Sequence, residues 1–197
     1  MDTAVKLNER KRFYEIIGGK KRMPPSASAN HGSIVLDLHY VFRNILRGKT
    51  FKFYADIDVV LSAEDTVRPD FAVIGDFSKI AGGKNIQGAP DFIAEVLSPS
   101  NSAYDLVIKK NLYQKHGVRE YWIVDINSRN IHVYRLNDEG LYGDPSIYHS
   151  FTEEEKQDIL NGYDDEDKEM IKITEIKTCT FGDEISVPID NIFENLI

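Results

Sequence analysis

Asp70, Glu95 and Lys109 are the side chains whose types and spacing best suit a single chemical task. Glu95 is the only charged residue within the apolar run 92–97, where a carboxylate costs several kcal/mol unless a cation or hydrogen-bond donors meet it. Asp70 lies in a second strand-like run, 67–75. If the two runs pair as antiparallel strands, Asp70 lies beside Glu95. Two carboxylates aimed at one point repel each other unless a positive charge lies between them.

A hard divalent cation is the simplest partner for such a pair. Mg²⁺ takes one or two carboxylates in proteins and keeps several waters, and Mn²⁺ is a possible substitute. Such an ion polarises a phosphodiester and lowers the pKa of a bound water. Asp105, Lys109 and Tyr113 follow Glu95 at i, i+4 spacing on one helix face, where a lysine could orient the attacking water or stabilise the phosphate. The pattern predicts a metal-dependent phosphodiesterase site built from Asp70, Glu95 and Lys109.

Each of these residues also has an ordinary structural interpretation. Glu95 could be a strand carboxylate held only by an ion pair with Lys109, and Asp70 could be a turn residue. Asp91 also follows a proline, but it lies about 13 Å from Glu95 along an extended strand, so Asp70 is the preferred ligand. Lys110 points about 100° away from Lys109 on a helix, so Lys109 is the preferred lysine.

The elements that must position these residues follow from the hydrophobic periodicity. A helix is predicted from Asn30 or Ser33 to about Arg47, and another from about 100 to 115. Strands are predicted at 13–17, 51–61, 67–75, 91–97, 118–125 and 130–136, with weaker candidates at 172–180 and 185–188 and a closing helix at 189–196. The stretch 77–88 is expected to be a loop that joins its neighbouring strands as a long hairpin. This order predicts an α/β fold of the α+β type, with a mixed β-sheet flanked by helices.

Composition limits the class of protein. The 197 residues fit one domain with a sizeable core, and no apolar run approaches the ~18 residues that span a bilayer. The single cysteine, Cys179, excludes an intrachain disulfide, and a cytoplasmic protein without membrane association is expected. The net charge of −8 argues against coating nucleic acid by bulk charge but leaves room for a local basic face. The acidic segment at about 152–170 is expected to be an insertion, either mobile or a short surface helix.

Several stretches form a combination that matches a known family. They are Arg68-Pro69-Asp70, the run 88–100 (GAPDFIAEVLSPS), the Asp105, Lys109 and Tyr113 set, and the run 117–125 (GVREYWIVD). In weaker form the match takes in Glu15, His31 and the tail 187–193. This combination resembles the Uma2 family of restriction-endonuclease-like proteins, within the PD-(D/E)XK nuclease-like superfamily. The resemblance implies a restriction-endonuclease-like core over residues 1–197, with a four-stranded mixed sheet flanked by helices.

The resemblance also implies roles for individual residues. In that superfamily the second core strand supplies the aspartate and the third the glutamate, and the lysine usually follows the glutamate by two residues. Here that position is Leu97, so the resemblance implies that Lys109 on the following helix supplies the lysine. Glu15 could approach the metal, as an extra acidic residue does in some relatives, or lie at the surface. His31 could contact substrate or anchor a loop.

Two functions remain open from the sequence. The first is a Mg²⁺-dependent endonuclease that hydrolyses DNA, with Mn²⁺ as an alternative ion and a homodimer as a plausible assembly that cuts both strands. The second is a non-catalytic module, binding nucleic acid or another partner, that retains the nuclease fold. Cleavage lost on substitution of Glu95 would favour the first, and the absence of divalent-ion binding would favour the second.

Overall fold

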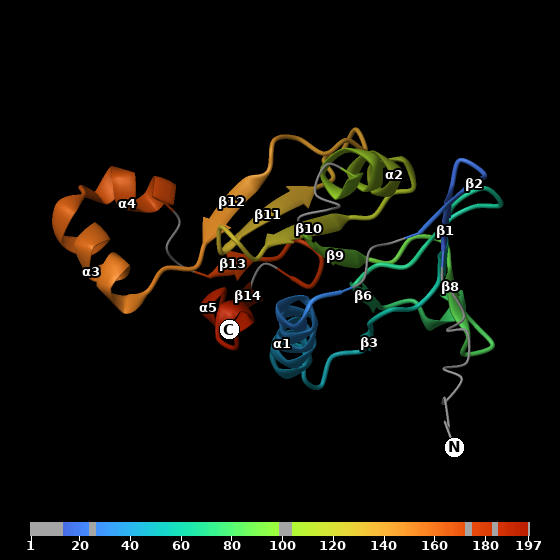
Figure 1. The fold of residues 1–197 in the computed structure, drawn as a ribbon, viewed down its shortest axis with the longest axis horizontal. Helices are drawn as coiled ribbons and strands as arrows, with labels where there is room; N and C mark the ends of the chain where they lie inside the picture. Colours follow the sequence, from blue (N-terminus) through green and yellow to red (C-terminus); the bar gives the residue numbers. More distant parts are fainter. Residues whose placement is uncertain (1–13, 24–26, 99–103, 172–174, 183–184, 197) are drawn as a thin grey trace, which may run out of the picture.

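The computed structural model describes residues 14–23, 27–98, 104–171, 175–182 and 185–196, and in addition leaves the side chains of Asp105 and 169–171 undescribed. The described residues form two six-stranded sheets, a small two-stranded sheet and several helices (Figure 1). Among the described residues, no helix is long and apolar enough to cross a membrane. The predicted mixed sheet flanked by helices is confirmed, although a second sheet was not foreseen.

The central sheet has the strand order β12-β11-β10-β9-β6-β3. Its strands are β3 (Lys52–Tyr54), β6 (Phe71–Ile74), β9 (Phe92–Val96), β10 (Glu120–Asp125), β11 (Asn130–Arg135) and β12 (Ser146–His149). Strands β9 and β10 are parallel, and all other neighbours in this sheet are antiparallel. The sheet is therefore mixed, and its middle strand β9 is buried along its whole length.

Helices cover the two faces of this sheet because successive strand residues point to opposite sides. Helix α1 (Ala29–Ile45) covers one face, where the ring of Phe42 packs 4.8 Å from that of Phe92 and 5.5 Å from that of Trp122. On the other face, residues of β9 and β10 pack with Leu112 of α2 (Lys110–Lys115). This packing holds β9 and β10 between α1 on one face and α2 on the other.

The start of α1 differs from the prediction. The sequence placed the cap at Asn30 or Ser33, but the helix begins at Ala29 because Ser28 Oγ accepts the backbone N–H of His31 at 3.2 Å. His31 consequently lies in the first helical turn. That position brings its ring to the end of the central sheet that carries Asp70.

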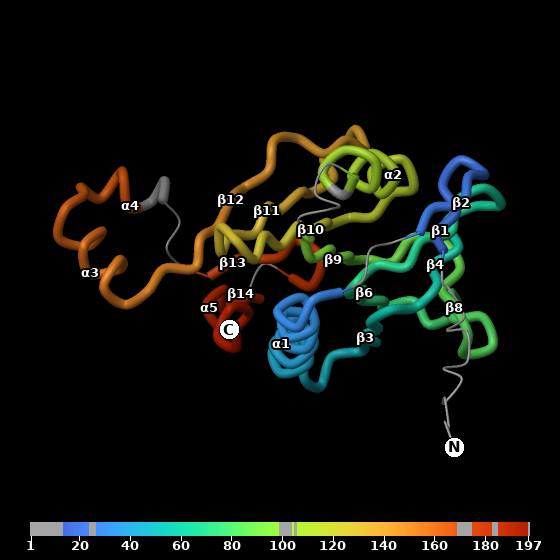
Figure 2. The backbone as a smooth tube through the Cα atoms, viewed as in Figure 1, coloured from blue at the N-terminus to red at the C-terminus, as the bar shows by residue number. Residues whose placement is uncertain are grey.

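The second sheet has the strand order β2-β1-β5-β4-β8-β7 and lies beside one edge of the molecule (Figure 2). Its strands are β1 (Glu15–Ile17), β2 (Lys20–Arg22), β4 (Val59–Val60), β5 (Thr66–Val67), β7 (Ile80–Ala81) and β8 (Asn85–Gln87). A short 3₁₀ helix, η1 (Phe77–Lys79), precedes β7. The predicted loop at 77–88 is therefore wrong, since it holds a hairpin of this sheet.

Two predicted long strands are each divided between the sheets. The run 51–61 contributes β3 to the central sheet and β4 to the second sheet, with Asp56 at a φ of 52° between them. The run 67–75 likewise supplies the end of β5 and all of β6, separated at Pro69, which has no N–H to donate to a ladder. These breaks place Asp70 at the junction of the two sheets.

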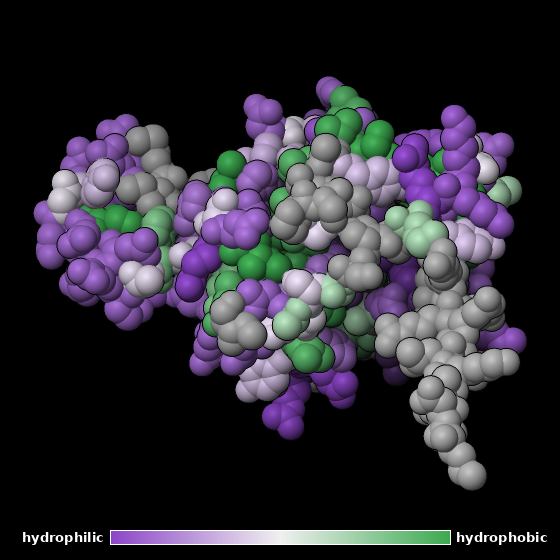
Figure 3. All heavy atoms as spheres, viewed as in Figure 1, coloured by the Kyte–Doolittle hydropathy of each residue, from purple (hydrophilic) through white to green (hydrophobic). Residues whose placement is uncertain are grey.

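After β12, the chain first leaves the sheets as two helices and then returns to the core. Helices α3 (Glu153–Gly162) and α4 (Asp165–Ile171) extend away from the sheets, and their visible surface in Figure 3 is largely hydrophilic. A capping box between Thr152 and Glu155 starts α3, and the acidic segment is helical except at Tyr163 and Asp164 between the two helices. Strands β13 (Ile176–Lys177) and β14 (Ser186–Val187) and helix α5 (Asp190–Phe193) then pack into the core beside α1.

Candidate active site

The register of β6 and β9 brings Asp70 and Glu95 to one place. Phe71 pairs with Ala94 in the antiparallel ladder, so Asp70, one residue before β6, is opposite Glu95 in register. The backbone N–H of Val96 donates to Asp70 Oδ2 at 2.8 Å, which holds the aspartate against the end of β9. The antiparallel pairing predicted from the sequence is confirmed. The two carboxylates lie at the same end of the central sheet.

Glu95 is buried and bound by two groups from the next helix. Lys109 Nζ lies 2.9 Å from Glu95 Oε1, and the Tyr113 hydroxyl donates to the same oxygen at 2.6 Å. Glu95 is 2% exposed and Lys109 is 3% exposed. Lys109 and Tyr113 therefore share a helix face directed at Glu95, as their i, i+4 spacing predicts. The side chain of Asp105, the third residue of that stripe, lies outside the described residues.

The backbone that presents Lys109 is unusual. Residues Tyr104–Lys109 form a π-helix, η2, which passes directly into α2. π-helical turns are rare and occur often at functional sites, where they shift the direction of side chains. The helix thus changes its winding at the residue that contacts Glu95.

Glu15 joins the same ionic cluster from β1. Its Oε1 lies 3.1 Å from Lys109 Nζ and accepts the backbone N–H of Arg68 at 3.0 Å. Glu15 is 3% exposed, so the surface position that the sequence left open is wrong. One ammonium therefore bridges two buried carboxylates that come from different sheets.

His31 contacts Asp70 from the first turn of α1. Its Nε2 lies 3.0 Å from Asp70 Oδ1, while the other oxygen of Asp70 accepts from Val96. The side chains of His31 and Asp70 are 15% and 23% exposed, in contrast to the buried Glu95. Asp70 and His31 are thus the members of this group that solvent or a ligand reaches.

In this cluster, acidic side chains outnumber the single lysine. Glu15, Asp70 and Glu95 carry three negative charges against the single positive charge of Lys109. Among the described residues, no three His, Cys, Asp or Glu side chains are grouped as metal ligands. Mg²⁺ requires only one or two carboxylates when water completes its shell, so Asp70 and Glu95 fit such an ion.

Tyr113 stays protonated in this cluster. Complete burial, together with the charges of Glu95 and Glu15, raises the pKa of the Tyr113 phenol well above its usual value. The hydroxyl is therefore a donor that orients Glu95 and is not a base at neutral pH.

A further buried carboxylate, Asp65, ties together two elements that carry site residues. Its oxygens accept from the backbone N–H of Gly18 at 2.8 Å and lie 3.0 Å from His116 Nε2 and 3.2 Å from Lys115 Nζ. Gly18 follows β1, which carries Glu15, and the other two partners lie at the end of α2. The sequence analysis missed Asp65, since no local pattern relates it to residues about fifty positions away.

Several other acidic residues have structural roles. Asp125 caps the turn after β10 by accepting from Asn127 and Ser128. Asp91, just before β9, accepts the N–H of Gly75 on its Oδ2 at 2.7 Å. These carboxylates are engaged away from the candidate site.

The mixed sheet and its flanking helices form a nuclease-like fold, as a comparison with solved structures shows. A crystal structure described as "a putative nuclease belonging to DUF820" from Anabaena variabilis ATCC 29413 matches with a TM-score of 0.68 at 19% identity, covering 96% of this chain and 94% of that one. The model of the Uma2 family, described as "Putative restriction endonuclease", matches residues 2–165. The chain belongs to the Uma2 family. A search of curated proteins found no match.

Proposed function

We propose that this chain is a Mg²⁺-dependent endonuclease that hydrolyses phosphodiester bonds of DNA, with Mn²⁺ as an alternative ion. The observation that carries the proposal is the placement of Asp70 opposite Glu95 at the strand ends, with Lys109 Nζ 2.9 Å from Glu95. Membership of a restriction-endonuclease family supports it. The excess of negative charge in the cluster supports a cation over a purely structural ion pair.

In this proposal Asp70 and Glu95 hold the metal. When bound, a divalent cation polarises the scissile phosphate and lowers the pKa of water. His31 and the N–H of Val96 fix the two oxygens of Asp70. Lys109 offsets the charge of Glu95 from the buried side and orients the attacking water, and Tyr113 holds the orientation of Glu95.

The test is cleavage of supercoiled plasmid in Mg²⁺ or Mn²⁺. Glu95→Gln and Asp70→Asn are each expected to reduce nicking by at least about 100-fold, in the range of losses that follow removal of an electrostatic catalytic group. Glu64→Gln is the matched control, because Glu64 is exposed and its side chain lies outside the cluster. Wild-type protein that never cuts DNA, or a Glu95→Gln variant that cuts as fast as wild type, would contradict the proposal.

One observation favours the alternative of a non-catalytic module with the nuclease fold. Glu95 is already paired with an ammonium, and both oxygens of Asp70 are hydrogen-bonded, so each of these carboxylates has a partner within the protein. Titration calorimetry separates the two functions. Binding of Mn²⁺ that disappears in Asp70→Asn supports the endonuclease, and no heat of binding in wild type supports the module.

A further inference from the structure

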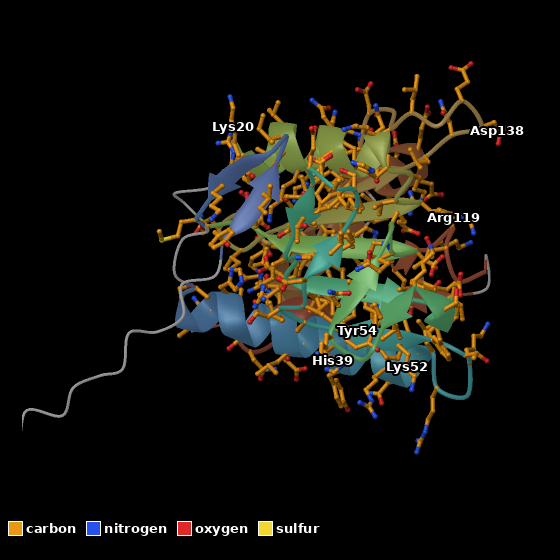
Figure 4. The ribbon with its side chains drawn as sticks, turned by 90° about the vertical axis from the view of Figure 1, so that its right-hand side faces the viewer. Lys20, His39, Lys52, Tyr54, Arg119 and Asp138 are labelled. Carbon is orange, nitrogen blue, oxygen red and sulfur yellow. The ribbon has the colours of Figure 1, made fainter. Side chains whose placement is uncertain are left out.

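A groove runs between the second half of α1 and strand β3, away from the candidate site. Its volume is about 730 Å³. The residues that line it belong to one segment of the chain and are Leu36, His39, Tyr40, Arg43, Asn44, Leu46, Arg47, Gly48, Lys49, Phe51, Lys52 and Phe53. Figure 4 labels His39 and Lys52 along the lower edge of the molecule, where α1 and β3 lie.

Four cationic side chains line this groove. They are Arg43, Arg47, Lys49 and Lys52, and all four are exposed. No Asp or Glu is among the described residues that line it. Because the whole chain carries a net charge of −8, this concentration of positive charge is a local exception. The groove is a local basic face of the kind that the net charge of the whole chain does not exclude.

The end of α1 explains only part of this charge. Arg43 lies in the last turn of α1, where a cation offsets the partial negative charge of the helix terminus. Lys49 and Lys52 lie beyond the helix, in the turn and in β3, where that effect has faded. Burial and the charge of Arg43 lower the pKa of His39, so the positive charge of the groove comes from arginine and lysine.

The groove also presents an aromatic surface. Tyr40 is 68% exposed and lines the groove on the same helix as Arg43. Grooves that bind nucleic acid strands combine cations that follow the phosphates with aromatic rings on which unpaired bases stack. An exposed tyrosine beside four cations fits that chemistry better than it fits an apolar partner.

We propose that this groove binds a nucleic-acid strand through its phosphates. The proposal goes beyond the proposed cleavage, because such binding requires neither a metal nor Asp70 and Glu95. Arg43 lies twelve residues after His31 on α1, which is about 18 Å along the helix axis. At about 3.4 Å per phosphate along a duplex strand, that distance corresponds to about five phosphates. The groove is therefore a second contact, separate from the candidate site.

The salt dependence of binding measures the number of phosphates contacted. The logarithm of the association constant falls with the logarithm of salt concentration by about 0.9 per contact for duplex DNA and about 0.7 for a single strand. Four contacts give slopes of about −3.6 and about −2.8. Between 50 and 200 mM salt, the affinity that these contacts provide would fall about 150-fold for duplex and about 50-fold for single strands.

The experiment is a fluorescence-anisotropy titration of 30-nucleotide DNA, single-stranded and duplex, in EDTA at several salt concentrations. The groove variant carries Arg43→Ala, Arg47→Ala, Lys49→Ala and Lys52→Ala. The control variant removes four exposed cations elsewhere, at Lys20, Lys84, Arg119 and Lys177; Figure 4 shows Lys20 and Arg119 away from the groove. Circular dichroism and thermal melting check that both variants keep the fold.

For duplex DNA, the groove variant is expected to make the slope of log association constant against log salt shallower by about 3 to 4, while the control variant changes it by less than 1. Tyr40→Ala is expected to weaken only the single-strand arm, by about 5- to 100-fold. The proposal would be overturned if wild-type protein bound neither single-stranded nor duplex DNA. It would also be overturned if the groove variant and the control variant reduced the salt dependence of binding by equal amounts. A groove variant that binds DNA normally but loses self-association in sedimentation would overturn it too, since the occupant would then be a second copy of the chain. Because EDTA removes the divalent ions that the proposed cleavage needs, these binding results do not depend on whether the protein cuts DNA.

Discussion

Replacing Lys109 with methionine removes the ammonium from a buried ionic cluster while keeping an unbranched chain of similar reach. Lys109 Nζ lies 3.1 Å from Glu15 Oε1 and 2.9 Å from Glu95 Oε1. Both glutamate side chains are 3% exposed, so water cannot replace the lost charge easily. The variant leaves two carboxylates close together without the ammonium that they share.

The expected cost follows from this burial. Removing one partner of a buried ion pair destabilises a protein by about 3–5 kcal/mol, because a charge is left uncompensated. For a chain of this size, 1 kcal/mol shifts Tm by about 2–4 °C, so Lys109→Met should melt about 6–20 °C below wild type. If Asp70 and Glu95 hold a divalent cation, 10 mM Mg²⁺ should raise the Tm of the variant more than that of wild type, because the ion replaces the missing charge.

Lys110→Met is the control for this prediction. Lys110 contributes a cation–π contact, with its Nζ 5.3 Å from the ring centroid of Tyr134, worth about 0.5–1 kcal/mol. Urea unfolding should therefore separate the two variants by at least about 2 kcal/mol. The double variant Glu15→Gln with Lys109→Met should recover part of the loss, since one carboxylate charge is gone. Equal stability of the two lysine variants would refute the assignment of Lys109 as the shared counter-ion.

Two further predictions concern hydrogen bonds to buried carboxylates. Tyr113→Phe removes the 2.6 Å hydrogen bond to Glu95 and should lower the free energy of unfolding in urea by about 1.5–3 kcal/mol. It should also lower kcat with little change in KM, and an unchanged kcat would exclude an orienting role for Tyr113. Burial raises the pKa of Asp65, but the Gly18 N–H and the contacts with His116 and Lys115 outweigh it and leave that pKa well below its ordinary value. Its stabilisation is thus present above the unfolded pKa of about 3.9 and lost as pH falls toward the lower folded value. Asp65→Asn should be about 2–3 kcal/mol less stable than wild type at pH 7, and this difference in the free energy of unfolding should narrow below pH 4. A difference that stays constant with pH would contradict this prediction.

The site residues were predictable to the extent that they lie in one local pattern. Glu95 is conspicuous as a carboxylate in an apolar strand, and the i, i+4 spacing of Lys109 and Tyr113 predicts a common face. The structure directs that face at Glu95. The role of Glu15 was not predictable, because its partners Lys109 and Arg68 are far away in sequence and nothing near Glu15 marks it as buried.

The fold was predictable where periodicity and burial agree. Helix α1 and the strands β9, β10 and β11 follow clear apolar patterns, and each lies within its predicted range or within one or two residues of it. The second sheet was missed because its strands have only two or three residues each, too few to show alternation. A run such as 51–61 looks continuous in sequence even though its two ends pair with strands of different sheets.

The sequence by itself determined the residue types of the site, the apolar strand that carries Glu95 and the family to which the chain belongs, because these depend on composition and spacing along a short stretch. Tertiary structure alone decided that Lys109 bridges Glu15 and Glu95, that His31 and Val96 hold Asp70, and that one basic groove lies on an acidic chain. The contacts of Lys109 and Asp70 join residues that are distant in sequence, whereas the groove forms within the single segment 36–53 where the end of α1 meets β3. Their energies depend on burial and on the distance between charges, which only the folded chain defines.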